Sequence, residues 1–133
     1  MSVLDRALLA GSCLYFLAIA AWLILAPQAF YAAIPGVMAS GPLNVHLLRD
    51  VGIAYAVLSM GCAYALADSA AARFATAFAA IYLCGHAALH AFMESSNRNQ
   101  HLTLAEAPGV YAPALLATAV ALRFGRGRPA PNL

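Results

Sequence analysis

The sequence is poor in charge, which is the first indication of the solvent around it. Only 9% of its 133 residues are charged and 64% are hydrophobic, whereas about a quarter of the residues of a soluble domain are normally charged. Lysine is absent, so all seven basic residues are arginine. A net charge of +2, with no basic patch interleaved with aromatic residues, argues against nucleic-acid binding. The composition therefore predicts an integral membrane protein with the lipid bilayer as its main partner.

Cysteine is also scarce, and its spacing does not match the common zinc and redox motifs. Cys13, Cys62 and Cys84 each lie inside an apolar run, and no CxxC pair occurs. Free cysteine commonly behaves as a small buried hydrophobe, and we expect that behaviour here. A disulfide or a thiolate metal site is the alternative.

Four apolar segments are long enough, or nearly long enough, to cross a bilayer, which takes about 20 helical residues. The predicted spans are residues 7–26, 43–67, 70–93 and 107–124. The last is short and contains two prolines, which a membrane helix tolerates where its neighbours satisfy the freed carbonyl groups. The sequence therefore predicts an all-α fold, an antiparallel bundle of four transmembrane helices in a single domain of residues 1–124.

The arginines predict the orientation of the bundle, because cytoplasmic loops carry the excess of basic residues. Arg6 precedes the first span, Arg73 lies between the second and third, and three arginines follow the fourth. The other two connections hold only Arg98. We therefore predict that both termini are cytoplasmic, in a multi-pass protein of the bacterial inner membrane. Residues 125–133 are expected to form a short disordered tail.

Two further patterns concern packing. The connection 28–41 contains Phe30 and Tyr31, and aromatic residues favour the headgroup level of a bilayer, so we expect a short helix along the interface. Small side chains permit close helix contact in membranes, and two predicted packing faces follow them: Gly52, Ala56, Met60 and Ala63 in the second span, and Ala75, Ala79 and Ala80 in the third.

The ionisable residues of the spans gather at one end of the predicted bundle. His46 and Asp50 open the second span, and His86, His90 and Glu94 close the third. Helical residues four apart share a face. Between antiparallel neighbours, Asp50 and His86 would lie level, about 10 Å inside the outer boundary at 1.5 Å per residue. Ionisable groups in a span are costly, about 2.5–3.5 kcal/mol each at its centre, so we expect the five groups to satisfy one another around one point.

These residue types suit a metal site. Imidazole and carboxylate ligands bind zinc, iron, copper or manganese, and helix bundles place His and Glu on facing helices for this purpose. The metal hypothesis uses His46, Asp50, His86, His90 and Glu94, and a haem would take two of the histidines as axial ligands. Weaker candidates as ligands or ion-pair partners are Arg49, which suits an anion or carboxylate, and Asn44, His101 and Glu106.

Three interpretations of this cluster stay open. In a structural one, Asp50 accepts a hydrogen bond from His86, and Arg49 pairs with Glu94 or a lipid phosphate, which fixes helix register. In the second, the cluster holds a divalent transition metal or haem. In the third, it is a proton relay or a pocket for a small polar ligand.

The sequence does not decide whether the protein is an enzyme, since it contains no HExxH pattern, no phosphate-binding glycine loop and no Ser/His/Asp arrangement. We expect an accessory or binding protein of the membrane. The alternatives are a small metal- or haem-dependent membrane oxidoreductase, or a subunit of one, and a proton-coupled or small-ligand transporter.

One stretch resembles a known family. The run consists of Phe30-Tyr31, Ile34-Pro35-Gly36-Val37, Gly41-Pro42, Asn44, His46, Arg49-Asp50, Gly52 and Tyr55. It resembles a motif of small, uncharacterised bacterial four-helix membrane proteins, which are similar to the DoxX-like group in size and topology. The resemblance covers the first three spans and implies a four-helix fold without a reaction. Because some DoxX-type proteins are associated with membrane redox complexes, it also implies an accessory subunit in a larger membrane complex; a homo-oligomer is the other expectation.

Overall fold

The computed structural model describes residues 1–34, 36–38, 41–97 and 108–126, without the side chains of 93–97. Within these ranges the chain forms five helices and no strand, which confirms the all-α prediction. The helices are α1 Val3–Leu25, α2 Pro27–Ala33, α3 Val45–Ala67, α4 Ala72–Asn97 and α6 Tyr111–Gly125. Three of them, α1, α3 and α4 as far as Phe92, are long and apolar enough to cross a membrane. The prediction of a membrane protein with transmembrane helices is therefore confirmed.

Helix caps explain where the first two long helices begin. The Ser2 hydroxyl accepts a hydrogen bond from the Asp5 amide at 3.1 Å, and the Asp5 carboxylate accepts one from the Ser2 amide at 2.9 Å. This capping box satisfies two amides of the first turn, so α1 begins four residues before the predicted span. In α3, the Asn44 side chain accepts from the Leu47 amide at 3.0 Å and starts the helix at Val45.

The helix α6 is shorter than the predicted fourth span. It begins at Tyr111, after a turn at Pro108, rather than at residue 107. Pro113 lies in its first turn, where proline breaks no helical hydrogen bond. Fifteen residues rise about 22 Å, less than the hydrocarbon thickness of about 30 Å. The fourth span therefore stays a prediction.

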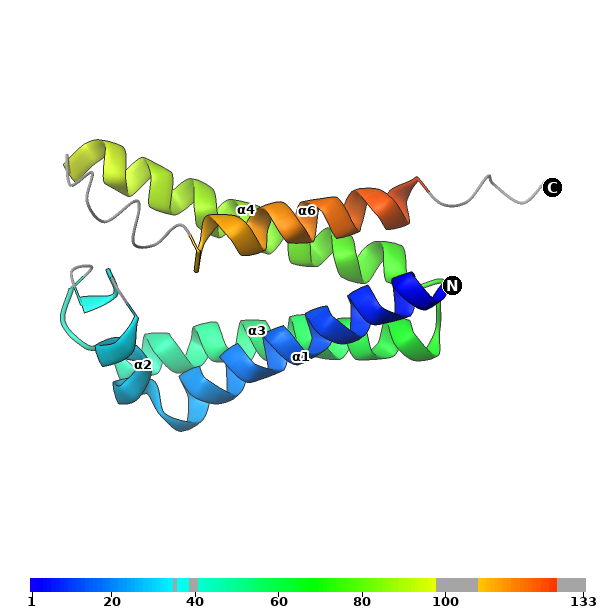
Figure 1. The fold of residues 1–133 in the computed structure, drawn as a ribbon. Helices are drawn as coiled ribbons and strands as arrows, with labels where there is room; N and C mark the ends of the chain where they lie inside the picture. Colours follow the sequence, from blue (N-terminus) through cyan, green and yellow to red (C-terminus); the bar gives the residue numbers. More distant parts are fainter. Residues whose placement is uncertain (35, 39–40, 98–107, 127–133) are drawn as a thin grey trace.

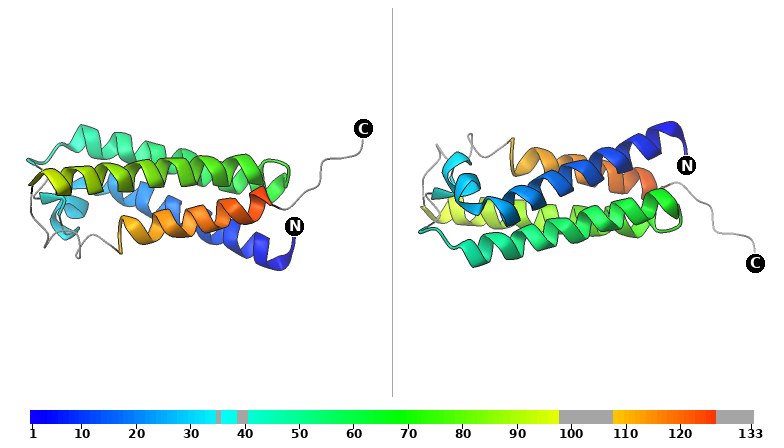
Figure 2. Two further views of the ribbon diagram at one scale, coloured as in Figure 1. Left: turned by 90° about the horizontal axis from the view of Figure 1, so that it is seen from above. Right: turned by 90° about the horizontal axis from the view of Figure 1, so that it is seen from below.

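The helices form two layers (Figure 1). The most extensive contact joins α1 to α3 and the next joins α4 to α6, while α3 and α4 touch over a smaller area. The start of α1, the α3–α4 turn and the end of α6 lie together at what we call the terminal end, and α2, the start of α3 and the end of α4 lie at the α2 end (Figure 2). Figure 1 shows the layers close together at the α3–α4 turn and farther apart at the α2 end.

Side-chain size accounts for the difference between the α1–α3 contact and the α3–α4 contact. At Gly52 of α3, an added Cβ would lie 2.7 Å from Cγ1 of Ile24 and 3.3 Å from the Ala20 carbonyl oxygen of α1. Between α3 and α4, in contrast, the rings of Tyr55 and Tyr82 meet edge to face with centroids 5.5 Å apart. Small residues let membrane helices approach closely, whereas a pair of rings holds them apart.

The predicted packing face of the second span is only partly right. The buried residues of α3 are Gly52, Tyr55, Ser59, Cys62 and Ala65, whereas Met60, which was predicted to lie on that face, is 70% exposed. The buried stripe advances by three and four residues in turn, as a helix of 3.6 residues per turn requires. The prediction followed small residues four positions apart. Because one turn takes 3.6 residues, that series moves away from the buried stripe after one turn. In α4, Ala79 is buried as predicted.

The three cysteines are free thiols, but they differ in burial. Cys62 is buried, Cys13 is half-buried, and the sulfur of Cys13 lies 3.4 Å from the Ser59 hydroxyl. Cys84 is exposed, so the prediction of a buried hydrophobe is confirmed for Cys62 and wrong for Cys84, whose sulfur lies 3.2 Å from the Thr118 hydroxyl of α6.

The expected short helix between the first two spans is present as α2. The Phe30 ring packs edge to face on Trp22 of α1 at 5.2 Å, and the Tyr31 hydroxyl donates to the Gly41 carbonyl at 2.8 Å. The first contact holds α2 against the end of α1, and the second ties it to the connection that leads to α3. Its aromatic side chains therefore serve packing within the chain as well as any contact with lipid.

Candidate binding site

The first predicted pair lies at the start of α3. His46 Nε2 is 3.4 Å from Asp50 Oδ2, one helical turn away. The two side chains are 88% and 54% exposed. An exposed pair of this kind contributes little to stability, about 0.2–0.5 kcal/mol, so its imidazole and carboxylate remain accessible to a ligand.

The two polar neighbours of this pair have structural roles. Arg49 Nε donates a hydrogen bond to the Ile24 carbonyl at 3.3 Å, which is one of the last carbonyls of α1 and has no partner within that helix. Asn44 uses its side-chain oxygen as the cap of α3. The predicted pairing of Arg49 with Glu94 lies outside the described residues, because the Glu94 side chain is not among them.

The second predicted pair lies near the end of α4. The imidazole rings of His86 and His90 have centroids 4.7 Å apart at an angle of 67°. Both side chains are partly buried. The Tyr82 ring lies parallel to the His86 ring, at an angle of 3° and a distance of 6.5 Å. Tyr82 extends the four-residue spacing of the histidines by one turn, a signal that the sequence analysis did not use.

A line of aromatic rings connects the histidine pair to the core. The Tyr82 ring meets Tyr55 of α3, which in turn meets Phe16 of α1 with centroids 6.1 Å apart. Tyr55 is only 7% exposed. The orientation of His86 is therefore tied to all three of the long helices, whereas His46 and Asp50 lie on an open surface.

The His46–Asp50 pair and the His86–His90 pair lie at similar heights in the bundle, but these four side chains do not come together as one cluster. The Tyr55–Tyr82 contact sets the register of the antiparallel helices α3 and α4. Asp50 lies five residues before Tyr55, and His86 lies four residues after Tyr82, which places them at nearly the same height. Yet among the described side chains no three of His, Cys, Asp or Glu lie close enough to hold a metal. The divergence of the layers at this end accounts for the separation.

The five-residue metal site therefore stays a prediction. Four of its members are described as two separate pairs, and the fifth, Glu94, has no described side chain. The weaker candidates His101 and Glu106 lie outside the described residues.

Comparisons with known proteins do not extend this description. No model of a known protein family matches the chain, and no curated protein or solved structure matches it. The resemblance to DoxX-like proteins gains no support from these searches. The functional argument therefore rests on the residues of this chain.

Proposed function

We propose that this chain is a four-span protein of the bacterial inner membrane that acts as a small accessory or binding protein. Three apolar helices of sufficient length support membrane insertion. The helix α6 packs along α4, in support of a fourth, short span. In this arrangement the termini are cytoplasmic, since Arg6, Arg73 and Arg123 belong to the terminal end, and the histidines belong to the outer side.

The proposed ligand is a divalent transition-metal ion such as Zn²⁺ or Cu²⁺, held by His86 and His90. The observation that carries the proposal is the 4.7 Å separation of these rings on one face of α4. Two histidines four residues apart can turn nitrogens towards one ion, as in helical zinc motifs, and imidazole suits zinc, copper and nickel. A pair of protein ligands leaves coordination positions open, which fits a binding role better than a closed structural site.

Metal binding by the purified protein tests this function. We expect the wild type to bind one Zn²⁺ or Cu²⁺ ion per chain in calorimetric titration and elemental analysis. The His86→Ala/His90→Ala variant should bind at least about tenfold more weakly, because even second-shell changes cost 10–100-fold at metal sites. The matched control is His46→Ala, which removes an imidazole from the same end and should stay within about twofold of the wild type.

Other outcomes separate the alternatives. An equal loss in His46→Ala would replace the two-histidine site with the larger predicted cluster. Equal, near-zero metal in the wild type and the double variant would exclude the metal function. Visible absorbance of the purified protein that disappears in the double variant would assign haem to the same two histidines.

A further inference from the structure

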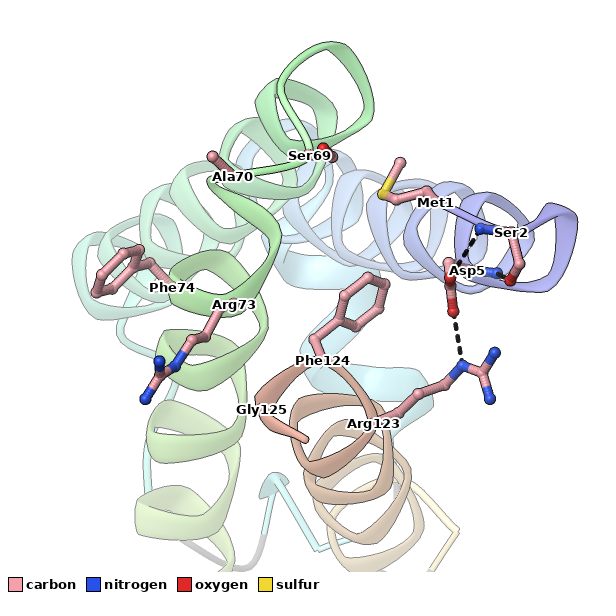
Figure 3. A pocket seen from close by; sticks show the side chains of 10 residues that line it. All are labelled: Met1, Ser2, Asp5, Ser69, Ala70, Arg73, Phe74, Arg123, Phe124 and Gly125. Atoms are coloured by element: carbon pink, nitrogen blue, oxygen red, sulfur yellow. Dashed lines mark hydrogen bonds and ion pairs between the residues drawn. The ribbon is translucent and has the colours of Figure 1, made fainter. Parts of the chain in front are cut away.

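A recess lies at the terminal end, remote from the histidines. It has a volume of about 500 Å³ and is bounded by the start of α1, the α3–α4 turn, the start of α4 and the end of α6 (Figure 3). Ligand pockets typically measure about 300–1,000 Å³. The recess is therefore large enough for a headgroup-sized molecule, and the site at the α2 end makes no use of it.

The charged side chains that line the recess are two arginines and one aspartate. Arg123 Nε donates to Asp5 Oδ1 at 2.7 Å, and the other Asp5 oxygen accepts from the Ser2 amide at 2.9 Å. Both Asp5 oxygens are thus engaged, while the two terminal nitrogens of Arg123 have no partner among the described residues. The Arg73 side chain is exposed, and its guanidinium group likewise makes no hydrogen bond or ion pair with the part of the chain that the structure describes. The lining is therefore net positive, with donors available for an anion.

The arrangement of these cations favours a ligand with two separate anionic groups. Figure 3 shows the Arg73 and Arg123 side chains extending away from each other, with the Phe124 ring between the two residues, so the two guanidinium groups do not converge on one point. Arginine binds phosphate through a planar fork of donors. One phosphate near each arginine, in a single ligand, matches this arrangement better than a single phosphate does.

The recess opens onto an apolar helix face. Phe74 lines it and is 64% exposed, and Phe78, one turn further along α4, is 63% exposed. Because α4 is long and apolar enough to cross a membrane, its first turn lies near the headgroups and this aromatic row faces the acyl chains. A cationic recess continuous with an apolar row suits an amphiphile.

We infer that the recess binds an anionic phospholipid that carries two phosphodiesters, with one phosphate at Arg73 and the other at Arg123. Its acyl chains lie along Phe74 and Phe78. Basic pockets between transmembrane helices are established sites for such headgroups. The inference rests on the membrane insertion proposed above and is independent of the histidine site.

Native mass spectrometry of the detergent-solubilised chain tests the inference. Diphosphatidylglycerol, phosphatidylglycerol, phosphatidylethanolamine and inorganic phosphate are titrated separately. We expect diphosphatidylglycerol to bind most tightly to the wild type. The Arg73→Gln/Arg123→Gln variant should bind it about 25-fold more weakly, at about fivefold for each arginine. The matched control is Arg6→Gln, which removes the same charge from α1 outside the recess and should change affinity less than about twofold.

Several results would overturn the inference. Equal binding of phosphatidylethanolamine and diphosphatidylglycerol to the wild type would do so without any variant, even if the double variant failed to fold. Equal affinity for phosphatidylglycerol would exclude the two-phosphate headgroup, and inorganic phosphate that displaces the lipid at similar concentration would assign the recess to a free anion. An equal loss of lipid affinity in Arg6→Gln would indicate that binding depends on the overall positive charge of this end rather than on the recess. The His86→Ala/His90→Ala variant should keep its lipid preference, so that failure of the metal site and failure of the lipid site are distinguishable.

Discussion

Replacing Tyr55 with alanine should lower the free energy of unfolding by about 3 kcal/mol, as for other buried aromatic residues. The ring is 7% exposed and contacts Phe16 of α1 and Tyr82 of α4, so it joins the two layers, which touch each other less than the helices within each layer do. Its removal leaves a gap that the surrounding helices fill only in part. Unfolding in mixed micelles, followed by circular dichroism, measures the loss.

Two matched variants separate ring packing from other effects. Tyr55→Phe keeps the ring, and because the Tyr55 hydroxyl makes no hydrogen bond with a described residue, it should stay within about 1 kcal/mol of the wild type. Tyr64→Ala removes a ring of the same helix that is 62% exposed and should cost less than about 1 kcal/mol. Equal losses in Tyr55→Ala and Tyr64→Ala would contradict the proposed role of Tyr55.

The Tyr55 substitution also links stability to the histidine site. Tyr55 supports Tyr82, and the Tyr82 ring is stacked on His86. We therefore expect Tyr55→Ala, under conditions where it is folded, to weaken metal binding, while Tyr55→Phe leaves it unchanged. Metal titration of the two variants against the wild type measures this coupling.

The local part of the architecture could be predicted from the sequence, because it depends on residues close together in the chain. Long apolar runs predicted α1, α3 and α4 to within a few residues. The spacing of four predicted that His46 shares a helix face with Asp50 and His86 with His90, and the structure shows both pairs in contact. The early start of α1 was also readable, since Ser2 and Asp5 have the spacing of a capping box.

The arrangement between helices was harder to predict, because it depends on side chains that meet across interfaces. The short connection between the second and third spans indicates that α3 and α4 are antiparallel, but it does not indicate that Tyr55 and Tyr82 separate them or that the layers diverge towards the histidines. The recess was missed for a similar reason. Its ion pair joins Asp5 to Arg123, which lie 118 positions apart in the chain, and no local pattern relates them.

At Gly52, the close contact between α1 and α3 depends on the absence of a Cβ atom. Valine there should lower the free energy of unfolding by about 2–3 kcal/mol, as overpacking does in tight interiors. An added Cβ already lies 2.7 Å from Ile24 Cγ1 and 3.0 Å from Leu23 Cβ, so α1 would have to move away from α3. That movement would also break the hydrogen bond from Arg49 to the Ile24 carbonyl. Unfolding in mixed micelles and the retention of folded protein after purification measure the effect.

Two glycines of the same helices provide the controls. At Gly61 of α3 an added Cβ would lie 3.7 Å from Ala75, an ordinary contact, and at Gly11 of α1 it would meet no atom within 4 Å. Alanine at either position should be neutral or stabilising by up to about 1 kcal/mol, since it favours helix more than glycine does. Gly52→Ala should instead be destabilising despite the same gain in helix propensity. If all three alanine variants were equally stable, α1 and α3 would not depend on a close approach at Gly52, and their tight pairing would need another cause.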